Sequence, residues 1–173
     1  KICSMNQPLA ERLRPRSFDE VIGQEGLLGP DGQLRLLINR DLVPSLIFWG
    51  PPGVGKTTLA QLIAEQSKRK FYTLSAINSG VKEVREILQK AQGQGLFAQG
   101  KSPILFIDEI HRFSKSQQDS LLHAVEKGTV VLIGATTENP SFEVIPALRS
   151  RCQVYVLEGL NQAELQKLLN RAL

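Results

Sequence analysis

The segment 50–57 reads Gly-Pro-Pro-Gly-Val-Gly-Lys-Thr, and its glycines, lysine and threonine are the strongest chemical signal in the chain. A glycine, four residues, and then Gly-Lys-Thr is the spacing of a loop that holds nucleotide phosphates. Glycine backbones come close to the phosphates and direct successive N–H groups at one anion. In such a loop Lys56 reaches the β- and γ-phosphates, and the Thr57 hydroxyl binds Mg²⁺. A nucleoside triphosphate with Mg²⁺ is therefore the expected ligand. The predicted phosphate-binding residues are Gly50, Pro51, Pro52, Gly53, Val54, Gly55, Lys56, Thr57 and Thr58.

Two carboxylates, Asp108 and Glu109, end a second apolar run. Asp108 is predicted to hold Mg²⁺ directly or through water, and Glu109 to polarise the water that attacks the γ-phosphate. A merely polar strand end is the alternative interpretation. His111 is a second candidate base, because imidazole titrates near neutral pH. Phosphoryl transfer depends mainly on positioning and charge, so Glu109 already fills this role and His111 is interpreted as structural or coupling.

Two further polar residues lie next to later apolar runs. Thr137 comes after the run 129–135 and is predicted to sense the γ-phosphate or to hold the water, with Asn139 as the alternative. Arg151 lies just before the run 152–157 and is a candidate to reach a neighbouring subunit's nucleotide. A guanidinium supplied in trans is worth about 10³ to 10⁵ in turnover. From spacing alone, however, a surface arginine is the favoured interpretation.

Short apolar runs alternate with segments of helical spacing, which is typical of an α/β fold with a parallel sheet. The predicted strands are 46–49, 71–75, 104–107, 129–135 and 152–157, and helical spacing is found at 34–40, 58–64, 81–91 and 165–173. Gly93, Gly95 and Gly100 predict a flexible connection before the third strand. Asn161 and Glu164 resemble a capping pair ahead of the last helix.

The sites of open parallel sheets lie at the carboxyl ends of the strands. This rule places the four polar residues predicted to do chemistry in one cleft, although they are distant in sequence. They are Lys56, Asp108, Glu109 and Thr137.

The chain as a whole has an ordinary globular composition, with 173 residues and a net charge of +4. This charge permits an anionic partner such as nucleic acid without requiring one. The two cysteines, Cys3 and Cys152, are too few for a disulfide framework and favour a reducing, intracellular compartment. No segment resembles a membrane span or a secretory signal, so no membrane partner is expected. We expect a fragment of a longer protein in three parts: a loose end at 1–7, a nucleotide-binding core at 8–160, and the first helix of a further domain at 161–173.

Three stretches together resemble a known family. They are the loop at 50–58, the block Ile-Asp-Glu-Ile-His-Arg-Phe at 107–113 with Lys-Ser-Gln-Gln-Asp at 115–119, and Gly-Ala-Thr-Thr-Glu-Asn-Pro-Ser-Phe at 134–142. They closely resemble the AAA+ ATPases of the RarA/MgsA family, which comprises replication-associated recombination protein A in bacteria and Werner helicase-interacting protein in eukaryotes. The resemblance runs from residue 8 to residue 160, and the second and third stretches are the most particular to this family.

The resemblance implies a three-layer α/β/α P-loop fold with a five-stranded parallel sheet, and ATP or ADP with Mg²⁺ as cofactors. It implies that Lys56 and Thr57 are Walker A residues, that Asp108 and Glu109 are Walker B residues, and that Thr137 is sensor 1. It also makes Arg151 the arginine finger, which reverses the interpretation from spacing. Family members continue into a helical lid and an oligomerisation domain that forms a tetramer. Leu9, Ala10, Val21 and Ile22 match the part that lines the adenine pocket.

The implied function is a DNA-stimulated ATPase of replication-fork maintenance, recombination and repair, in the cytoplasm or the nucleus. The implied partners are single-stranded, gapped or forked DNA and replication-fork proteins such as a single-stranded-DNA-binding protein. Lys82 and Arg85 are candidate DNA contacts, because in related clamp loaders the matching helix faces DNA; a solvated helix face is the alternative, since Glu83 and Glu86 lie close by.

Other functions remain open at this point. A clamp-loader-like assembly switch and a RuvB-like branch-migration motor both fit the motifs. The Asp-Glu-x-His match at 108–111 also occurs in helicases, but those need two tandem motor domains. A small-molecule phosphotransferase would need a substrate pocket, and no segment predicts one.

Overall fold

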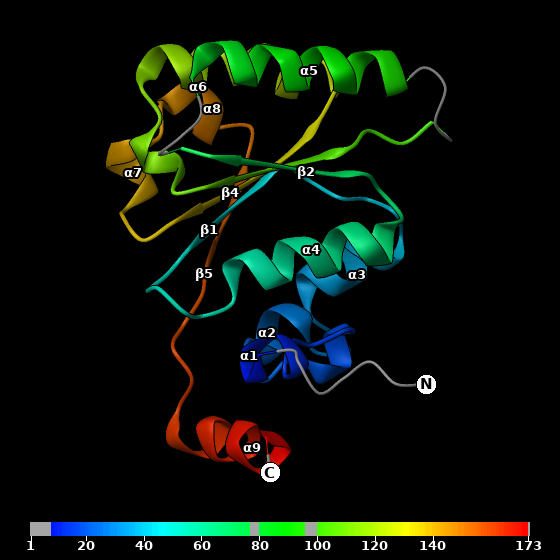
Figure 1. Ribbon diagram of the computed structural model, residues 1–173, viewed down its shortest axis with the longest axis vertical. Coiled ribbons are helices and arrows are strands. Elements are labelled where there is room, and N and C mark those ends of the chain that lie inside the picture. Colours follow the sequence, from blue (N-terminus) through cyan, green and yellow to red (C-terminus); the bar gives the residue numbers. More distant parts are fainter. Residues whose placement is uncertain (1–7, 77–79, 96–99, 173) are drawn as a thin grey trace.

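The computed structural model describes residues 8–76, 80–95 and 100–172, and its centre is one parallel sheet (Figure 1). The strand order is β2-β3-β4-β1-β5, and every neighbouring pair is parallel. The strands are β1 (Leu46–Trp49), β2 (Phe71–Ser75), β3 (Ile104–Asp108), β4 (Val131–Thr136) and β5 (Gln153–Val156). The predicted α/β fold with a five-stranded parallel sheet is confirmed.

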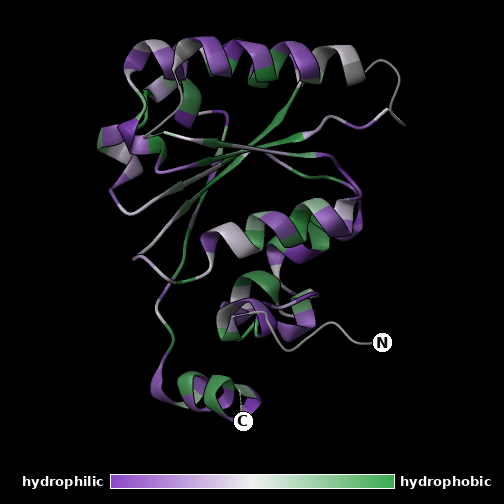
Figure 2. Ribbon diagram, in the orientation of Figure 1, coloured by the Kyte–Doolittle hydropathy of each residue, from purple (hydrophilic) through white to green (hydrophobic). Residues whose placement is uncertain are grey.

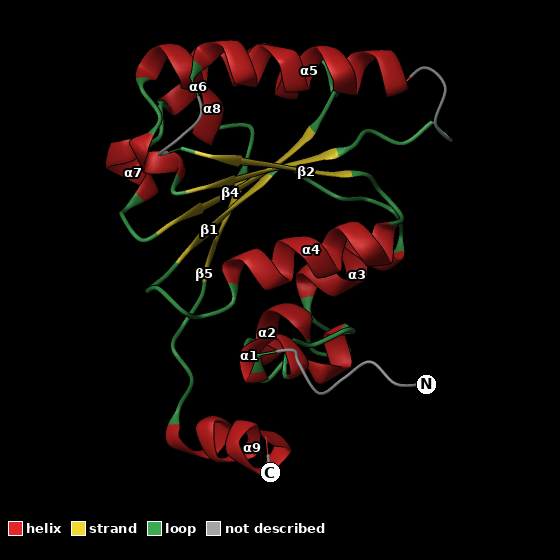
Figure 3. Ribbon diagram, viewed as in Figure 1, coloured by secondary structure: helices red, strands yellow, loops and turns green. Residues whose placement is uncertain are grey.

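Helices cover both faces of this sheet (Figure 3). One layer contains α3 (Gln33–Asn39) and α4 (Lys56–Ser67), with the short α1 (Leu9–Arg12), η1 (Phe18–Glu20) and α2 (Glu25–Leu28) beyond them. The other contains α5 (Val81–Gly95), α6 (Lys115–Glu126), α7 (Pro140–Glu143) and α8 (Pro146–Arg149), and η2 (Ile110–Arg112) follows β3. The last helix, α9 (Gln162–Ala172), lies apart from the sheet.

Side chains of successive strand residues point to opposite faces and so build two cores. Phe48 and Phe106 belong to the cluster on the α4 side, whereas Ile47 and Leu105 belong to the cluster under α5 and α6. Figure 2 shows hydrophobic colouring along the strands and polar colouring on the outer side of α5. Strands buried on both faces explain why the sequence shows continuous apolar runs rather than alternation.

Several element boundaries differ from the sequence prediction. Helix α5 continues to Gly95, so Gly93 and Gly95 lie inside a helix and not in a flexible connection. Strand β5 is an edge strand that pairs only with β1, and most of it is exposed. Helix α9 begins at Gln162, three residues earlier than expected. Its predicted capping pair is confirmed, since Asn161 and Glu164 each accept a hydrogen bond from the other's backbone N–H.

Helix α6 was not predicted, although its start carries a capping box. Ser114 Oγ accepts from Gln117 N, and the Gln117 side chain accepts from Ser114 N. Within the described residues, no helix has the length and apolar character that crossing a membrane would need. Residues 1–7, predicted to be a loose end, lie outside the described part of the chain.

Candidate nucleotide-binding site

The loop between β1 and α4 needs glycine for two different reasons. Gly53 and Gly55 have φ values of +81° and +92°, a region that side chains with a Cβ rarely adopt, and a Cβ at either position would meet nothing within 4 Å. Gly50 is instead crowded, because a Cβ there would lie 2.4 Å from the carbonyl oxygen of Leu157. The loop is thus pressed against the chain that follows β5, and it ends at the N-terminus of α4. The backbone N–H groups of that first turn lack helical partners and favour an anion.

The ammonium of Lys56 is held inside this loop. The side chain is buried, and Nζ donates to the carbonyl oxygens of Gly50 at 2.7 Å and Pro51 at 2.8 Å. Burial lowers the pKa of Lys56, while the negative charges of Glu109 and then Asp108 act in the opposite direction. Lys56 therefore lies within electrostatic reach of both carboxylates, as the carboxyl-end rule predicts for a parallel sheet.

The two carboxylates stand at the end of β3 in an unusual turn. The backbone N–H of Glu109 donates to Asp108 Oδ1 at 3.1 Å, and Glu109 itself has a left-handed φ of +54°. Such a conformation costs of order 1–3 kcal/mol for a residue with a side chain and persists where the surroundings impose it. Here the turn starts η2, whose Ile110 is fully buried; a Cβ on Gly134 of β4 would lie 3.1 Å from the Ile110 Cδ1.

His111, which the sequence assigns a structural or coupling role, joins β3 to β4. Its Nε2 lies 3.2 Å from Glu109 Oε2, and its Nδ1 lies 2.9 Å from Thr136 Oγ1. Thr136 ends β4, is fully buried, and accepts the Gly50 N–H at 3.2 Å through its carbonyl oxygen. Thr136 was not among the site residues predicted from the sequence, which include its neighbour Thr137. Alternation of side chains along the strand could have identified Thr136. Because Thr136 and Thr137 are adjacent at the strand end, however, the sequence does not show which of the two faces β3.

Thr137 and Asn139 follow β4 on the same side as the loop. Thr137 is the next residue after the one that contacts Gly50, and it is half-buried. Asn139 Oδ1 accepts from Ser141 N at 2.9 Å and so caps α7. The cap gives Asn139 a structural task, and Thr137 stays the sensor candidate.

Arg151 is placed away from this group. It precedes β5, whose Gln153 pairs with Leu46, the first residue of β1, whereas the phosphate loop follows the last residue of β1. Arg151 Nη2 lies 2.5 Å from Glu126 Oε1, and Nη1 donates to the carbonyl oxygen of Ala147 at 2.7 Å. The structure therefore places Arg151 near the amino ends of the strands, whereas the phosphate loop of the same chain lies at their carboxyl ends.

The adenine-pocket candidates lie in the N-terminal segment. Leu9 and Ala10 are in α1, and the Leu9 side chain is exposed. Val21 and Ile22 are half-buried between η1 and α2, and Val21 packs on the same apolar cluster as Val54 of the phosphate loop.

The segment around Val21 and Ile22 is also tied to the C-terminal part of the chain. Gln24 Nε2 donates to the carbonyl oxygen of Glu158 at 2.7 Å. Arg171 of α9 pairs with Glu20 at 2.8 Å.

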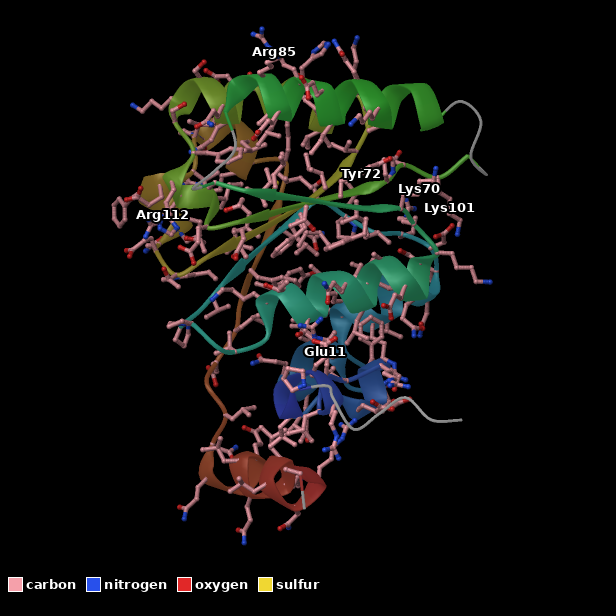
Figure 4. The ribbon with its side chains drawn as sticks, viewed as in Figure 1. Glu11, Lys70, Tyr72, Arg85, Lys101 and Arg112 are labelled. Atoms are coloured by element: carbon pink, nitrogen blue, oxygen red, sulfur yellow. The ribbon has the colours of Figure 1, made fainter. Side chains whose placement is uncertain are left out.

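The DNA candidates are both exposed on α5. Arg85 lies on the outer side of this helix and points away from the sheet (Figure 4). Lys82 is one turn earlier, and Glu83 and Glu86 are exposed on the same helix. The pair stands across the sheet from α4, so any contact there is separate from the phosphate loop.

The residues present fit a magnesium nucleotide better than a metal held by protein alone. In the described ranges, no three His, Cys, Asp or Glu side chains gather into a metal site. Magnesium is usually bound by one or two carboxylates together with substrate phosphates. Here the Asp108 carboxylate and the exposed Thr57 hydroxyl can supply the protein ligands, and the nucleotide can supply the phosphates. Cys152 is a free thiol whose pKa burial raises to about 12, which disfavours the nucleophilic thiolate.

Known proteins resemble this chain in both sequence and structure. Residues 46–160 match the family described as "ATPase family associated with various cellular activities (AAA)". The chain is 51% identical over 166 residues to ATPase WRNIP1 of Dictyostelium discoideum, covering 96% of this chain and 19% of that protein. It is 50% identical over 165 residues to replication-associated recombination protein A of Haemophilus influenzae, covering 95% of this chain and 36% of that protein.

Among solved structures, the RuvB Holliday junction branch migration motor of Thermotoga maritima has a TM-score of 0.74 and 32% sequence identity. The match covers 92% of this chain and 53% of that one. The chain thus spans about a third or less of the two curated relatives and about half of the solved motor. By its sheet, its loop and these matches, the chain belongs to the AAA family of ATPases, in the group of replication-associated recombination protein A and ATPase WRNIP1.

Proposed function

We propose that the chain is the catalytic core of an ATPase that hydrolyses ATP to ADP and phosphate and couples this turnover to DNA. The observation that carries the proposal is that Lys56, after β1, and Asp108 and Glu109, at the end of β3, lie at the carboxyl ends of strands in one parallel sheet, within electrostatic reach of one another. A cation for the phosphates and carboxylates for the metal and the water come together there from distant parts of the chain. Membership of the AAA family supports the hydrolysis.

The loop and Lys56 bind the phosphates in this proposal. The N–H groups of the loop and of the first turn of α4 hold the β-phosphate, and Lys56 exchanges its contacts with Gly50 O and Pro51 O for phosphate oxygens. Magnesium, when bound at Thr57 and Asp108, neutralises charge on the phosphates. Glu109 accepts a hydrogen bond from the attacking water and orients it in line with the γ-phosphorus. Thr137 contacts the γ-phosphate or this water.

Arg151 acts on the nucleotide of a neighbouring subunit. Arg151 lies near the amino ends of the strands and its own phosphate loop lies at their carboxyl ends, which supports an action in trans. A guanidinium that reaches the γ-phosphate stabilises the charge that develops in the transition state. The active form is then a homo-oligomer, and the family resemblance implies a tetramer. In an isolated subunit Arg151 does not contribute to hydrolysis.

The adenine lies against the N-terminal segment, with Val21 and Ile22 as its apolar contacts and Leu9 and Ala10 beyond them. The shared packing of Val21 and Val54 supports this position.

The DNA role rests on the relatives and on α5. One relative is named a replication-associated recombination protein and another an ATPase. The RuvB structure is described as a Holliday junction branch migration motor. Exposed Lys82 and Arg85 present positive charge that suits a phosphate backbone. The proposed partners are single-stranded, gapped or forked DNA and replication-fork proteins such as a single-stranded-DNA-binding protein, in the cytoplasm or the nucleus. The RuvB likeness makes branch migration the second candidate.

The test is ATP turnover by the full-length protein with single-stranded, gapped and forked DNA, alongside Glu109→Gln. We expect DNA to raise turnover of the natural chain, and Glu109→Gln to keep ATP binding while losing hydrolysis. Unchanged hydrolysis in Glu109→Gln would refute the assignment of Glu109. No stimulation by any DNA, together with partner binding that needs ATP, would favour an assembly switch instead.

A further inference from the structure

His111 occupies a partly buried position between the polar ends of two neighbouring strands. One ring nitrogen contacts Glu109 after β3, and the other contacts Thr136 at the end of β4. The His111 side chain is 12% exposed and Glu109 is 28% exposed. Because the ring is mostly shielded from water and lies against the carboxylate, it favours one orientation of the Glu109 side chain.

For a neutral imidazole beside an ionised carboxylate, the kinds of atom in this cluster set the direction of each hydrogen bond. A carboxylate only accepts, so Nε2 of His111 carries the hydrogen that bonds Glu109. In the neutral ring, Nδ1 then accepts from the Thr136 hydroxyl at 2.9 Å, a shorter contact than the 3.2 Å between this hydroxyl and the Glu138 carbonyl oxygen. The Thr136 oxygen in turn accepts from the backbone N–H of Glu138 at 3.0 Å. A directed chain of hydrogen bonds therefore runs from the backbone after β4 to the carboxylate after β3.

The end of β4 also contacts the phosphate loop. The carbonyl oxygen of Thr136 accepts from the first loop residue, Gly50, and the sensor candidate Thr137 is the next residue along. The turn that bears His111 packs on the same strand, with Ile110 against Gly134. A shift of the end of β4 would thus reach Glu109 through one side chain.

We propose that His111 is a positioning residue. It holds the Glu109 carboxylate in the orientation that faces the attacking water, and it couples this orientation to the position of the end of β4. This inference rests on the proposed role of Glu109. His111 takes no proton from the water, because its Nε2 already donates to Glu109. Its role is to keep Glu109 in one orientation and to make that orientation depend on where Thr136 lies.

The experiment separates the two contacts of the ring. The amide nitrogen of a glutamine lies where Nε2 of histidine lies, and that of an asparagine lies where Nδ1 lies. His111→Gln therefore keeps a donor for Glu109, whereas His111→Asn and His111→Ala do not. Thr136→Val removes the hydroxyl at nearly constant volume. His123→Ala is the matched control, since His123 is exposed on α6. ATP affinity, KM, kcat and thermal unfolding are measured on the full-length protein.

We expect His111→Ala and His111→Asn to lower kcat roughly 10- to 100-fold with ATP affinity and KM unchanged, as when an outer hydrogen-bond partner of a functional side chain is lost. His111→Gln should recover most of this loss, Thr136→Val should show a smaller fall, and His123→Ala none. An unchanged kcat in His111→Ala, or an asparagine variant more active than the glutamine one, would overturn the proposal. If His111→Ala fails to fold, the glutamine and asparagine pair decides. Glu109→Gln in the same assay keeps the two proposals apart: its inactivity beside a fully active His111→Ala would reject only the role of His111.

Discussion

Replacing Gly50 by alanine tests how the loop is seated. The added Cβ would lie 2.4 Å from the Leu157 carbonyl oxygen, about 1 Å short of ordinary van der Waals contact. The opposing atom belongs to the backbone and cannot turn aside, so either the loop or the chain after β5 must move. Overpacking of this kind costs about 1–3 kcal/mol of unfolding free energy. A displacement of 1 Å in a positioned group can also cost about 100-fold in rate.

The matched control is Gly128→Ala, at the turn between α6 and β4. Gly128 has a φ of +65° with open space around it, so alanine there meets backbone strain without crowding. The assay compares urea midpoints and ATP turnover of the two variants with the natural chain. We expect Gly50→Ala to lose both stability and turnover, and Gly128→Ala to lose about 1 kcal/mol with normal turnover. Natural stability and turnover in Gly50→Ala would refute the crowding derived from the structure.

Three further predictions follow from the site and its surroundings. Arg151→Ala should lower turnover only in the assembled protein, and mixing it with Lys56→Ala subunits should restore part of the activity; an assembled mixture without rescue would speak against action in trans. Burial lowers the pKa of Lys56, so the unfolded chain keeps this proton up to about its usual 10.5, and the unfolding free energy should rise as pH increases toward that value. Lys56→Met should flatten this rise in urea midpoints measured from about pH 8 to pH 11, and an unaltered slope would contradict it. Arg85→Ala should reduce the salt dependence of DNA binding by about one unit of log–log slope, while Lys167→Ala on α9 should not; equal slopes for both would remove α5 from the DNA surface.

The sheet was predictable chiefly because its three central strands, β1, β3 and β4, are buried on both faces. A continuous apolar run as short as 104–107 is typical of an interior strand of a parallel sheet, and the polar residue that ends each run marks the carboxyl edge of the sheet. Strand β5 was found by the same rule, although it is an exposed edge strand. Its neighbours on the sheet, and hence its exposure, depend on strand order, which no local pattern encodes.

The phosphate loop and the two carboxylates could be read from spacing, whereas their tertiary contacts could not. The crowding at Gly50 comes from Leu157, which is more than a hundred residues away in sequence. The left-handed turn at Glu109 is imposed by packing of Ile110 on β4, since glutamate has no intrinsic preference for it. For the same reason the contact between His111 and Thr136 needed the pairing of β3 with β4 to be known.

In the proposed function, distant parts of the chain converge on one magnesium nucleotide at the carboxyl ends of the strands. A crystal structure of the protein with Mg²⁺ and a non-hydrolysable ATP analogue would reveal whether they do. It should show the γ-phosphate beside Lys56 and Glu109, with the metal between Thr57 and Asp108. A nucleotide bound elsewhere, or a metal far from Asp108, would contradict the claim.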